Sequence, residues 1–356
     1  MSKAKLASRR VFAVIGMLIV LALVDMYVMK EKETDGAMIT EQTEQKLELS
    51  AWLVDWEWKA GLADLQDIAG GLTRLQAFAA YFDDQDRLYF TKDSDEAFPK
   101  LFEAVKQNDL VDVDLTVVND RWNRDGTAVQ KDTALVTRLM ASETSRNQHI
   151  ADILDAVDKH SFRGVEIDYE KIGDQDWDNV CAFYTELYRQ LDAQGKSLRI
   201  VLEARTPIER LKLPAGPTYV MMAYNLYGNH SGPGPKADHA FLTKLTNRMK
   251  QVPGEKVIAL SAGGYDWAEG GKITSLTEKR AAELVSKKGA SPKRDEQSGA
   301  LYFDYLDERG VKHTVWYADA ETLSQWIDVS RKAGYHKIAI WRLGDLGQAT
   351  LEKLNR

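Results

Sequence analysis

The sequence predicts an α/β protein: a (β/α)8 TIM barrel with a small α+β insertion between its seventh and eighth strands, preceded by an N-terminal membrane anchor. Three observations lead to this fold class. The chain has 356 residues, enough for one such barrel with additions. Segments with strand character alternate with amphipathic helical segments from residue 49 onward. One strand-like segment, 164–170, carries acidic residues at alternate positions, a pattern that favours a functional strand.

The eight expected strands are short segments, most of them rich in β-branched and aromatic residues. They are 49–55, 75–82, 111–119, 164–170, 197–204, 219–225, 256–262 and 337–343. Helical spacing of apolar residues appears between most of them, for example at 132–159, 175–194, 237–250 and 320–333. Gly334 is expected to end the last of these helices. A doubly wound open sheet is the alternative fold, but no glycine-rich phosphate loop follows any of these strands.

The segment between the seventh and eighth strands is too long for a single helical connection. Within it, 301–306 and 311–317 have strand character and flank Asp307-Glu308-Arg309-Gly310, a sequence typical of a hairpin turn. We therefore expect a small insertion over about 265–318 on the loop side of the barrel. The barrel domain itself is expected to cover 49–356.

The N-terminus resembles a targeting segment. Residues 1–10 form a basic flank, 11–29 are almost entirely apolar, and 30–48 form a polar linker. The apolar segment nearly reaches the length of a membrane-spanning helix, so it predicts a signal anchor with the N-terminus inside and the barrel outside the cytoplasmic membrane. A cleaved signal peptide with secretion is the alternative, although no convincing cleavage site follows the apolar run.

The composition limits the possible functions. A net charge of −7 without a basic stripe makes nucleic acid an unfavoured partner. The single cysteine, Cys181, excludes an internal disulfide and a cysteine-based zinc site. The six histidines are scattered, so the sequence predicts no metal and no cofactor. It gives no indication of an oligomeric state.

The acidic strand is the strongest functional signal. Glu166, Asp168 and Glu170 are two residues apart, so a strand directs all three to one face. Like charges stacked on one face are costly, and proteins tolerate them mainly where they bind or react. A solvated edge strand is the alternative, but flanking helices favour a sheet covered on both faces. Repulsion among the three carboxyl groups should keep at least one of them protonated near neutral pH.

Aromatic and polar residues follow the other expected strands at the same end of the barrel, where barrel active sites lie. They are Trp56, Tyr81, Asn119, Tyr224, Asn225, Trp267 and Trp341. Flat sugar faces pack on aromatic rings, and carboxyl groups cleave glycosidic bonds. The sequence therefore predicts a carbohydrate-binding groove in which these residues meet the acidic strand.

Three segments resemble the signatures of glycoside hydrolase family 18, the chitinase-like enzymes. They are Phe162-Arg-Gly-Val-Glu-Ile-Asp-Tyr-Glu170, Met222-Ala-Tyr-Asn-Leu-Tyr-Gly228 and Ile340-Trp-Arg-Leu-Gly344. A fourth, Val315-Trp-Tyr-Ala-Asp319, is similar to a segment of bacterial branches that include spore peptidoglycan hydrolases and modules associated with polysaccharide deacetylases. The resemblance covers about 49–350.

This resemblance implies retaining hydrolysis of β-linked N-acetylhexosamine glycans, with the substrate's own acetamide as the nucleophile. Glu170 would be the general acid, Asp168 would hold the acetamide N–H, and Tyr224 would bind the acetamide oxygen. Trp341 would form the floor of the sugar subsite. The remaining substrate contacts would come from Glu166, Asn225, Trp56, Tyr81, Asn119 and Trp267.

The sequence departs from the family pattern at three positions. Arg163 and Glu166 stand where the family has aspartates, and Asn225 replaces an aspartate after the strand-six tyrosine. These changes bear on rate and substrate choice. A weakly active or inactive glycan-binding protein is therefore the alternative function, and a membrane-anchored scaffold is a third. Peptidoglycan, chitin-type oligomers and an N-acetylglucosamine exopolysaccharide all carry the required acetamide, so the sequence leaves the substrate open.

Overall fold

The computed structural model describes residues 46–108 and 112–355. The predicted basic flank, the signal anchor over 11–29 and nearly all of the linker lie outside these residues. Within the described part of the chain, no helix is long and apolar enough to cross a membrane.

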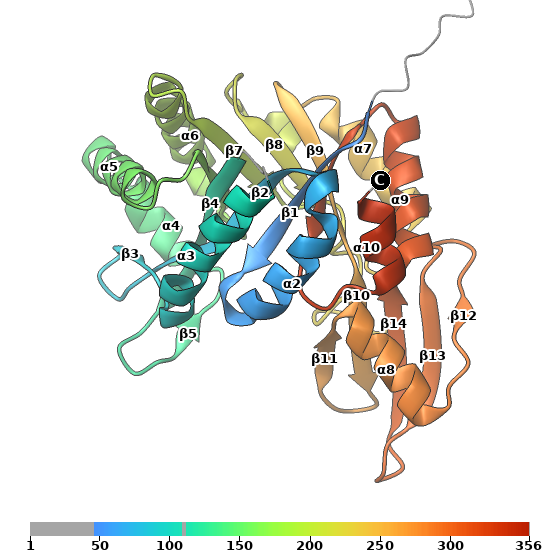
Figure 1. Cartoon of the computed structure of the whole chain (residues 1–356). Coiled ribbons are helices and arrows are strands. Elements are labelled where there is room, and N and C mark those ends of the chain that lie inside the picture. Colours follow the sequence, from blue (N-terminus) through green and yellow to red (C-terminus); the bar gives the residue numbers. More distant parts are fainter. Residues whose placement is uncertain (1–45, 109–111, 356) are drawn as a thin grey trace, which may run out of the picture. The chain divides into compact units, whose positions relative to one another are not determined.

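Eight parallel strands form a closed barrel (Figure 1). They are β1 Glu48–Val54, β2 Leu72–Phe82, β4 Asp112–Trp122, β6 Gly164–Asp168, β7 Ser197–Leu202, β8 Thr218–Met222, β9 Glu255–Ser261 and β15 Lys337–Trp341. Neighbours pair in this order, β15 pairs with β1, and the additional pairing of β2 with β4 closes the ring. The predicted barrel is confirmed and the open sheet is excluded. Each predicted strand corresponds to one of the eight, with ends shifted by up to three residues.

Helices surround the barrel (Figure 1). They are α2 Trp58–Ile68, α3 Lys92–Gln107, α4 Thr133–Met140, α5 Glu143–Lys159, α6 Trp177–Asp192, α7 His239–Met249, α9 Ala320–Lys332 and α10 Gln348–Leu354. Short 3-10 turns cover Asp55–Glu57, Ala69–Gly71, Asp174–Asp176 and Ile208–Arg210, and short strands β3 Leu88–Tyr89 and β5 Ala128–Val129 extend the sheet.

The helix predicted over 132–159 is two helices. Ser142 begins α5 with a capping box, in which its hydroxyl accepts from the Ser145 N–H and the Ser145 hydroxyl accepts from the Ser142 N–H. The prediction for Gly334 is confirmed, because it follows α9 with a φ of 92° and its N–H donates to the Arg331 carbonyl.

The core has two layers that follow from strand alternation. Val165 and Ile167 of β6 face outward into the apolar layer between barrel and helices. A second cluster, which includes Trp52, Met222 and Tyr224, fills the barrel interior. Glu166 and Asp168, which alternate with this outward pair, therefore point inward, so the acidic face of this strand is the interior face of the barrel.

Gly164 permits the close approach of β6 to β7. A Cβ atom at this position would lie 2.1 Å from the Ser197 hydroxyl oxygen and 2.4 Å from its carbonyl oxygen. Any side chain here would push apart the two strands that flank the acidic row.

The insertion between β9 and β15 is a five-stranded antiparallel sheet with one helix (Figure 1). Its elements are β10 Gly263–Ala268, β11 Ile273–Leu276, α8 Glu278–Lys288, β12 Lys293–Arg294, β13 Leu301–Leu306 and β14 Lys312–Ala318. It has an apolar cluster of its own around Phe303, Val315 and Tyr317. The predicted hairpin is confirmed, with Gly310 at a φ of 76° in its turn.

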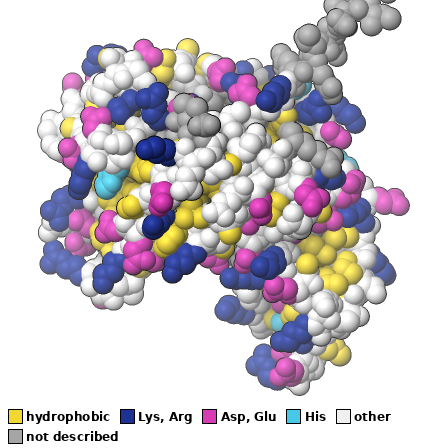
Figure 2. Space-filling model, viewed as in Figure 1, with side chains coloured by type: hydrophobic (Ala, Val, Ile, Leu, Met, Phe, Trp, Pro, Cys, Tyr) yellow, Lys and Arg dark blue, Asp and Glu magenta, His cyan; other side chains and the backbone are white. Residues whose placement is uncertain are grey.

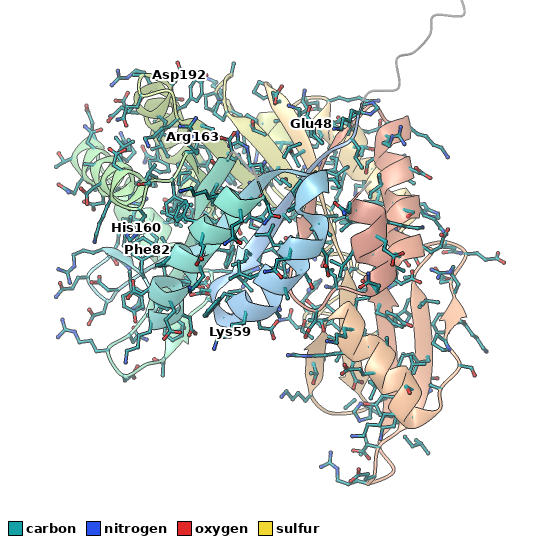
Figure 3. The ribbon with its side chains drawn as sticks, viewed as in Figure 1. Glu48, Lys59, Phe82, His160, Arg163 and Asp192 are labelled. Carbon is teal, nitrogen blue, oxygen red and sulfur yellow. The ribbon has the colours of Figure 1, made fainter. Side chains whose placement is uncertain are left out.

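Figure 3 distinguishes the two ends of the barrel. Glu48 and Arg163, which stand at the start of β1 and just before β6, lie at the upper end in this view, and Lys59, which follows β1, lies at the lower end. Arg163 is 65% exposed and lies 3.5 Å from the Asp112 carboxylate. This departure from the family pattern is therefore remote from the carboxyl ends of the strands. On the face shown in Figure 2, Lys and Arg side chains are interspersed with Asp and Glu.

Candidate active site

A cavity of about 650 Å³ opens at the carboxyl ends of the barrel strands. Barrel residues and residues of the insertion line it together. The lining includes Trp56, Phe78, Tyr81, Asn119, Asp120, Trp122, Lys131, Asp168, Glu170, Tyr224, Asn225, Lys236, Tyr265, Arg280, Trp341 and Arg342. Eight of the ten residues predicted from the sequence are brought together here, and Glu166 and Trp267 are not.

Asp168 is the last residue of β6 and is buried at the cavity floor. Its Oδ1 atom has no hydrogen-bond partner among the described residues. Burial raises the pKa of this carboxyl well above its usual value, and the negative charges of Glu170 and Glu166 raise it further. An unpaired buried acceptor that faces a cavity is suited to receive a donor from a bound ligand.

Glu170 lies two residues beyond the end of β6, so no ladder bond of that strand holds it. Instead, the Asn119 side chain binds its backbone on both sides: Oδ1 accepts from the Glu170 N–H at 2.9 Å, and Nδ2 donates to the Glu170 carbonyl at 3.0 Å. The Glu170 carboxylate contacts the Lys131 ammonium. Burial raises the pKa of Glu170, and the charge of Lys131 opposes this shift without cancelling it.

The structure corrects the role predicted for Glu166. This side chain is fully buried and does not line the cavity. Its Oε1 accepts from Trp52 Nε1 at 2.6 Å and from the Thr116 hydroxyl at 3.0 Å, and its Oε2 accepts from Arg199 Nε at 2.9 Å. Glu166 therefore occupies a deeper layer of the barrel, where Arg199 balances its charge.

Aromatic rings form the base of the cavity. The Tyr224 and Trp341 rings are nearly parallel, with centroids 6.4 Å apart, and Phe78 meets Trp341 edge-on at 5.1 Å. Trp56 is 48% exposed, and Arg342 lies over its ring at 5.7 Å. The peptide bonds Phe78–Ala79 and Trp341–Arg342 are both cis. These rings give the cavity a broad apolar surface next to the two carboxyl groups.

Three other predicted residues have distinct positions. Tyr81 lines the cavity, but its hydroxyl donates to the buried Asp55 carboxylate at 2.9 Å. Asn225 lines the cavity and is exposed. Trp267 is buried in β10, where its Nε1 donates to the Ser231 carbonyl at 3.1 Å. The predicted substrate contact of Trp267 is therefore corrected: Trp267 does not line the cavity, and Tyr265 of the same strand lines it instead.

The sequence argument did not single out Lys131, Lys236 or Tyr265 as site residues. Lys236 donates to the Ser261 hydroxyl at 2.8 Å and to the Ala262 carbonyl at 3.0 Å. Burial, with a smaller effect of the Arg342 charge, lowers the pKa of Lys236 to about 7. These residues stand in the loops after β4 and β8 and in the insertion, where no periodic pattern indicates which side chains turn inward.

No group of three or more His, Cys, Asp and Glu residues that could hold a metal ion occurs in residues 46–108 and 112–355. The side chains that line the cavity offer carboxyl groups for proton transfer, polar groups for hydrogen bonds and aromatic rings for stacking.

The raised pKa of the buried Asp168 carboxyl leads to a prediction about how the free energy of unfolding depends on pH. Because its pKa is raised in the folded protein, the native state binds more protons than the unfolded state between about pH 4 and the folded pKa. Stability should therefore fall as pH rises through this range and stay lower above it. Asp168→Asn removes the ionisation, so we expect a variant that is more stable than the parent at pH 7 and whose stability changes less with pH. Urea unfolding from pH 4 to pH 8 measures this.

Asp178→Asn is the matched control, because Asp178 is exposed in the first turn of α6 and has the same change of side chain. It should keep the pH dependence of the parent. An Asp168→Asn variant that is less stable than the parent at pH 7 would contradict the assigned burial penalty.

Known proteins resemble this chain in sequence and in fold. The family described as glycosyl hydrolases family 18 matches residues 56–345. The uncharacterized glycosylase YvbX of Bacillus subtilis is 24% identical over 226 residues, which is 59% of this chain and 66% of that protein. The cortical fragment-lytic enzyme of Bacillus anthracis is 24% identical over 229 residues, 53% of its length. The chain thus spans between about half and two thirds of these relatives.

A solved structure with the same fold is the Bacillus cereus spore cortex-lytic enzyme SleL, with a TM-score of 0.72 and 19% identity over 87% of this chain and 74% of that chain. A chitinase from Chromobacterium violaceum has the same TM-score with 18% identity, over 86% and 98% of the two chains. At these identities the structures show the shared fold. The family match covers most of the barrel and its insertion, as the motifs predicted, and the chain belongs to glycosyl hydrolases family 18.

Proposed function

We propose that this protein hydrolyses β-linked N-acetylhexosamine glycans with retention, using the acetamide group of the substrate as the nucleophile. The observation that carries the proposal is the convergence of Glu170, Asp168, Tyr224 and Trp341 in one cavity. Membership of the family supports glycan hydrolysis as the reaction. The bond, the mechanism and the residue roles are the proposed part.

Glu170 is the proposed general acid. It protonates the glycosidic oxygen as the bond to the leaving sugar breaks, and it later takes a proton from the attacking water. Its raised pKa supports this role, because an acid that acts near neutral pH must hold its proton there. The two hydrogen bonds from the Asn119 side chain, here called the Asn119 clamp, fix the Glu170 backbone from which this side chain extends.

Asp168 and Tyr224 are proposed to hold the acetamide. The free Oδ1 of Asp168 accepts the acetamide N–H, which turns the acetamide oxygen toward the anomeric carbon. That oxygen attacks and forms a cyclic oxazolinium ion, whose positive charge favours the ionised form of Asp168 and is stabilised by it. The Tyr224 hydroxyl binds the acetamide oxygen. Both side chains lie at the cavity floor, and Tyr224 is stacked on the proposed sugar platform, Trp341.

The departures from the family pattern are compatible with this mechanism. Arg163 lies at the other end of the barrel, and Glu166 forms a buried ion pair with Arg199. Asn225 keeps an amide at the cavity wall, where it can bind the substrate through hydrogen bonds without a charge.

Peptidoglycan is our proposed substrate, ahead of chitin-type oligomers and exopolysaccharide. Relatives named as cortical fragment-lytic and spore cortex-lytic enzymes support this choice. The apolar segment over 11–29 supports action outside the cytoplasmic membrane, with the chain anchored there or secreted after cleavage.

The full chain incubated with N-acetylglucosamine oligomers, purified peptidoglycan and a partly de-N-acetylated glucosamine polymer tests this proposal. Mass spectrometry of the products identifies the bond. NMR at early times identifies the anomer, and a β-anomer product from a β-linked glycan is expected. An inverted anomer would overturn the acetamide mechanism. Oligomer binding without any cleavage would favour the alternative function, a non-catalytic glycan-binding protein.

A further inference from the structure

Lys131 is a cation inside the cavity whose ammonium group contacts the proposed acid. It follows the short strand β5 with a φ of 54°, and its backbone N–H donates to Asp120 Oδ1 at 2.7 Å. These features direct the side chain across the cavity floor, where it contacts Glu170 Oε2. Lys131 keeps 36% of its side chain exposed, whereas Glu170 keeps 14%. The ammonium group is therefore reachable from the cavity.

This contact opposes the chemistry assigned to Glu170. A general acid must carry a proton, and an adjacent ammonium group favours the ionised carboxylate. The other charged groups that face Glu170 are the carboxylates of Asp120, Asp168 and Glu203, which favour the protonated form. Within the described residues, Lys131 is thus the group whose charge holds Glu170 toward the ionised state. The pKa of Lys131 is itself raised by Glu170, so the pair is mutually stabilising.

The other cations of the cavity are already engaged. Arg342 and Arg280 both bind Glu57, and Lys236 donates to the Ser261 hydroxyl and the Ala262 carbonyl. The Lys131 ammonium has Glu170 as its hydrogen-bond partner in the described chain. An anionic group on the ligand that entered beside Glu170 would therefore meet an accessible ammonium whose present partner is the acid.

We propose that Lys131 is a receptor for a carboxylate carried by the glycan, and that binding of this carboxylate draws the ammonium group away from Glu170. Glu170 then takes a proton from solvent and becomes the competent acid, while Lys131 stays charged throughout. The enzyme would thereby prefer glycans with carboxylate substituents over neutral N-acetylhexosamine polymers. This inference rests on the proposed function and narrows its substrate class.

Two forms of one glycan, with and without a charge on the lactyl group, test this preference. Peptidoglycan strands freed of their peptides carry a lactyl carboxylate on alternate sugars, and conversion of these groups to methylamides removes the charge. The parent should show a kcat/KM about 10- to 100-fold higher on the carboxylate strands, the range of a charge-assisted hydrogen bond. In a plot of kcat against pH, the alkaline limb of the parent should also lie at higher pH on the carboxylate strands than on the methylamide strands.

Lys131→Met should abolish both differences. On the methylamide strands its alkaline limb should move to higher pH, because Glu170 loses the charge that lowers its pKa. Lys171→Met is the matched control: Lys171 follows Glu170 directly, has a similar φ of 55° and is absent from the cavity lining. Lys131→Arg keeps the charge and should keep the preference. Circular dichroism checks that each variant is folded.

A Lys131→Met variant that retains the preference for carboxylate strands, or whose alkaline limb stays in place, would overturn the inference while leaving the proposed function intact. If the parent cleaves neither strand, peptidoglycan fails as the proposed substrate. Equilibrium binding of the two strands to the parent and to Lys131→Met then decides the receptor role, since loss of the charge preference in the variant supports it and its retention refutes it.

Discussion

Glu170→Gln is expected to lower kcat by about 100- to 10,000-fold, the usual contribution of a general acid. Glutamine has the size of glutamate and donates hydrogen bonds, but it cannot transfer a proton to the glycosidic oxygen. The Asn119 clamp binds the backbone of residue 170, so the position of the side chain should be preserved. Initial rates on peptidoglycan strands, with the affinity for the same strands measured by calorimetry, give the two quantities needed.

The matched control is Glu352→Gln, the same change on the exposed face of α10. It should leave both rate and affinity unchanged. A Glu170→Gln variant with the turnover of the parent would refute the assignment of the acid. A variant that loses affinity as much as rate would instead show that residue 170 binds substrate without transferring a proton.

Arg199→Met is expected to destabilise the protein by about 3–5 kcal/mol, the cost of leaving one partner of a buried ion pair uncompensated. The Arg199 side chain is 5% exposed and its partner Glu166 is fully buried. Trp52 and Thr116 still donate to the carboxylate in this variant, but its ion pair with Arg199 is lost. Chemical denaturation at pH 7 measures the loss.

The double variant Arg199→Met with Glu166→Gln removes both charges and is the control for the pair. It should recover most of the stability lost in the single variant, because the buried carboxylate is gone. Equal destabilisation in the single and double variants would show that packing around Arg199, rather than its charge, is what stabilises the barrel interior. Arg189→Met, at an exposed pair on α6, should change stability by less than about 1 kcal/mol.

The barrel could be predicted because its signals are local and repeated. Strand candidates such as 337–343 contain the apolar runs that are typical of a buried parallel sheet, and glycines such as Gly334 mark helix ends. The break between α4 and α5 was missed, since a serine capping box inside an amphipathic pattern gives a weaker signal than glycine or proline. The strand ends also differ from the prediction, most at the start of β2 and at the ends of β4 and β8.

The sequence predicts which face of the barrel the acidic side chains occupy, but not how deep inside the barrel each one lies. Alternation correctly predicts that Glu166, Asp168 and Glu170 share the interior face, yet it gives no information about which layer of the barrel each one reaches. Glu166 lies one layer below the cavity because Arg199 of β7 points inward at the same height. Lys131 and the exchange of Trp267 for Tyr265 depend on the conformations of loops and of the insertion, which no period in the sequence reports.

Asn119 limits what sequence comparison can reveal about the substrate. Its side-chain amide acts as a surrogate peptide group that binds the backbone of Glu170, two residues past the end of β6. An aspartate here would keep the acceptor for the Glu170 N–H and lose the donor to its carbonyl, and an aliphatic residue would leave both backbone groups unpaired. The range of residues tolerated at 119 is therefore set by the geometry of the chain and not by the glycan. An asparagine at this position in another protein reports how its strand ends, and gives no information about which sugar it binds.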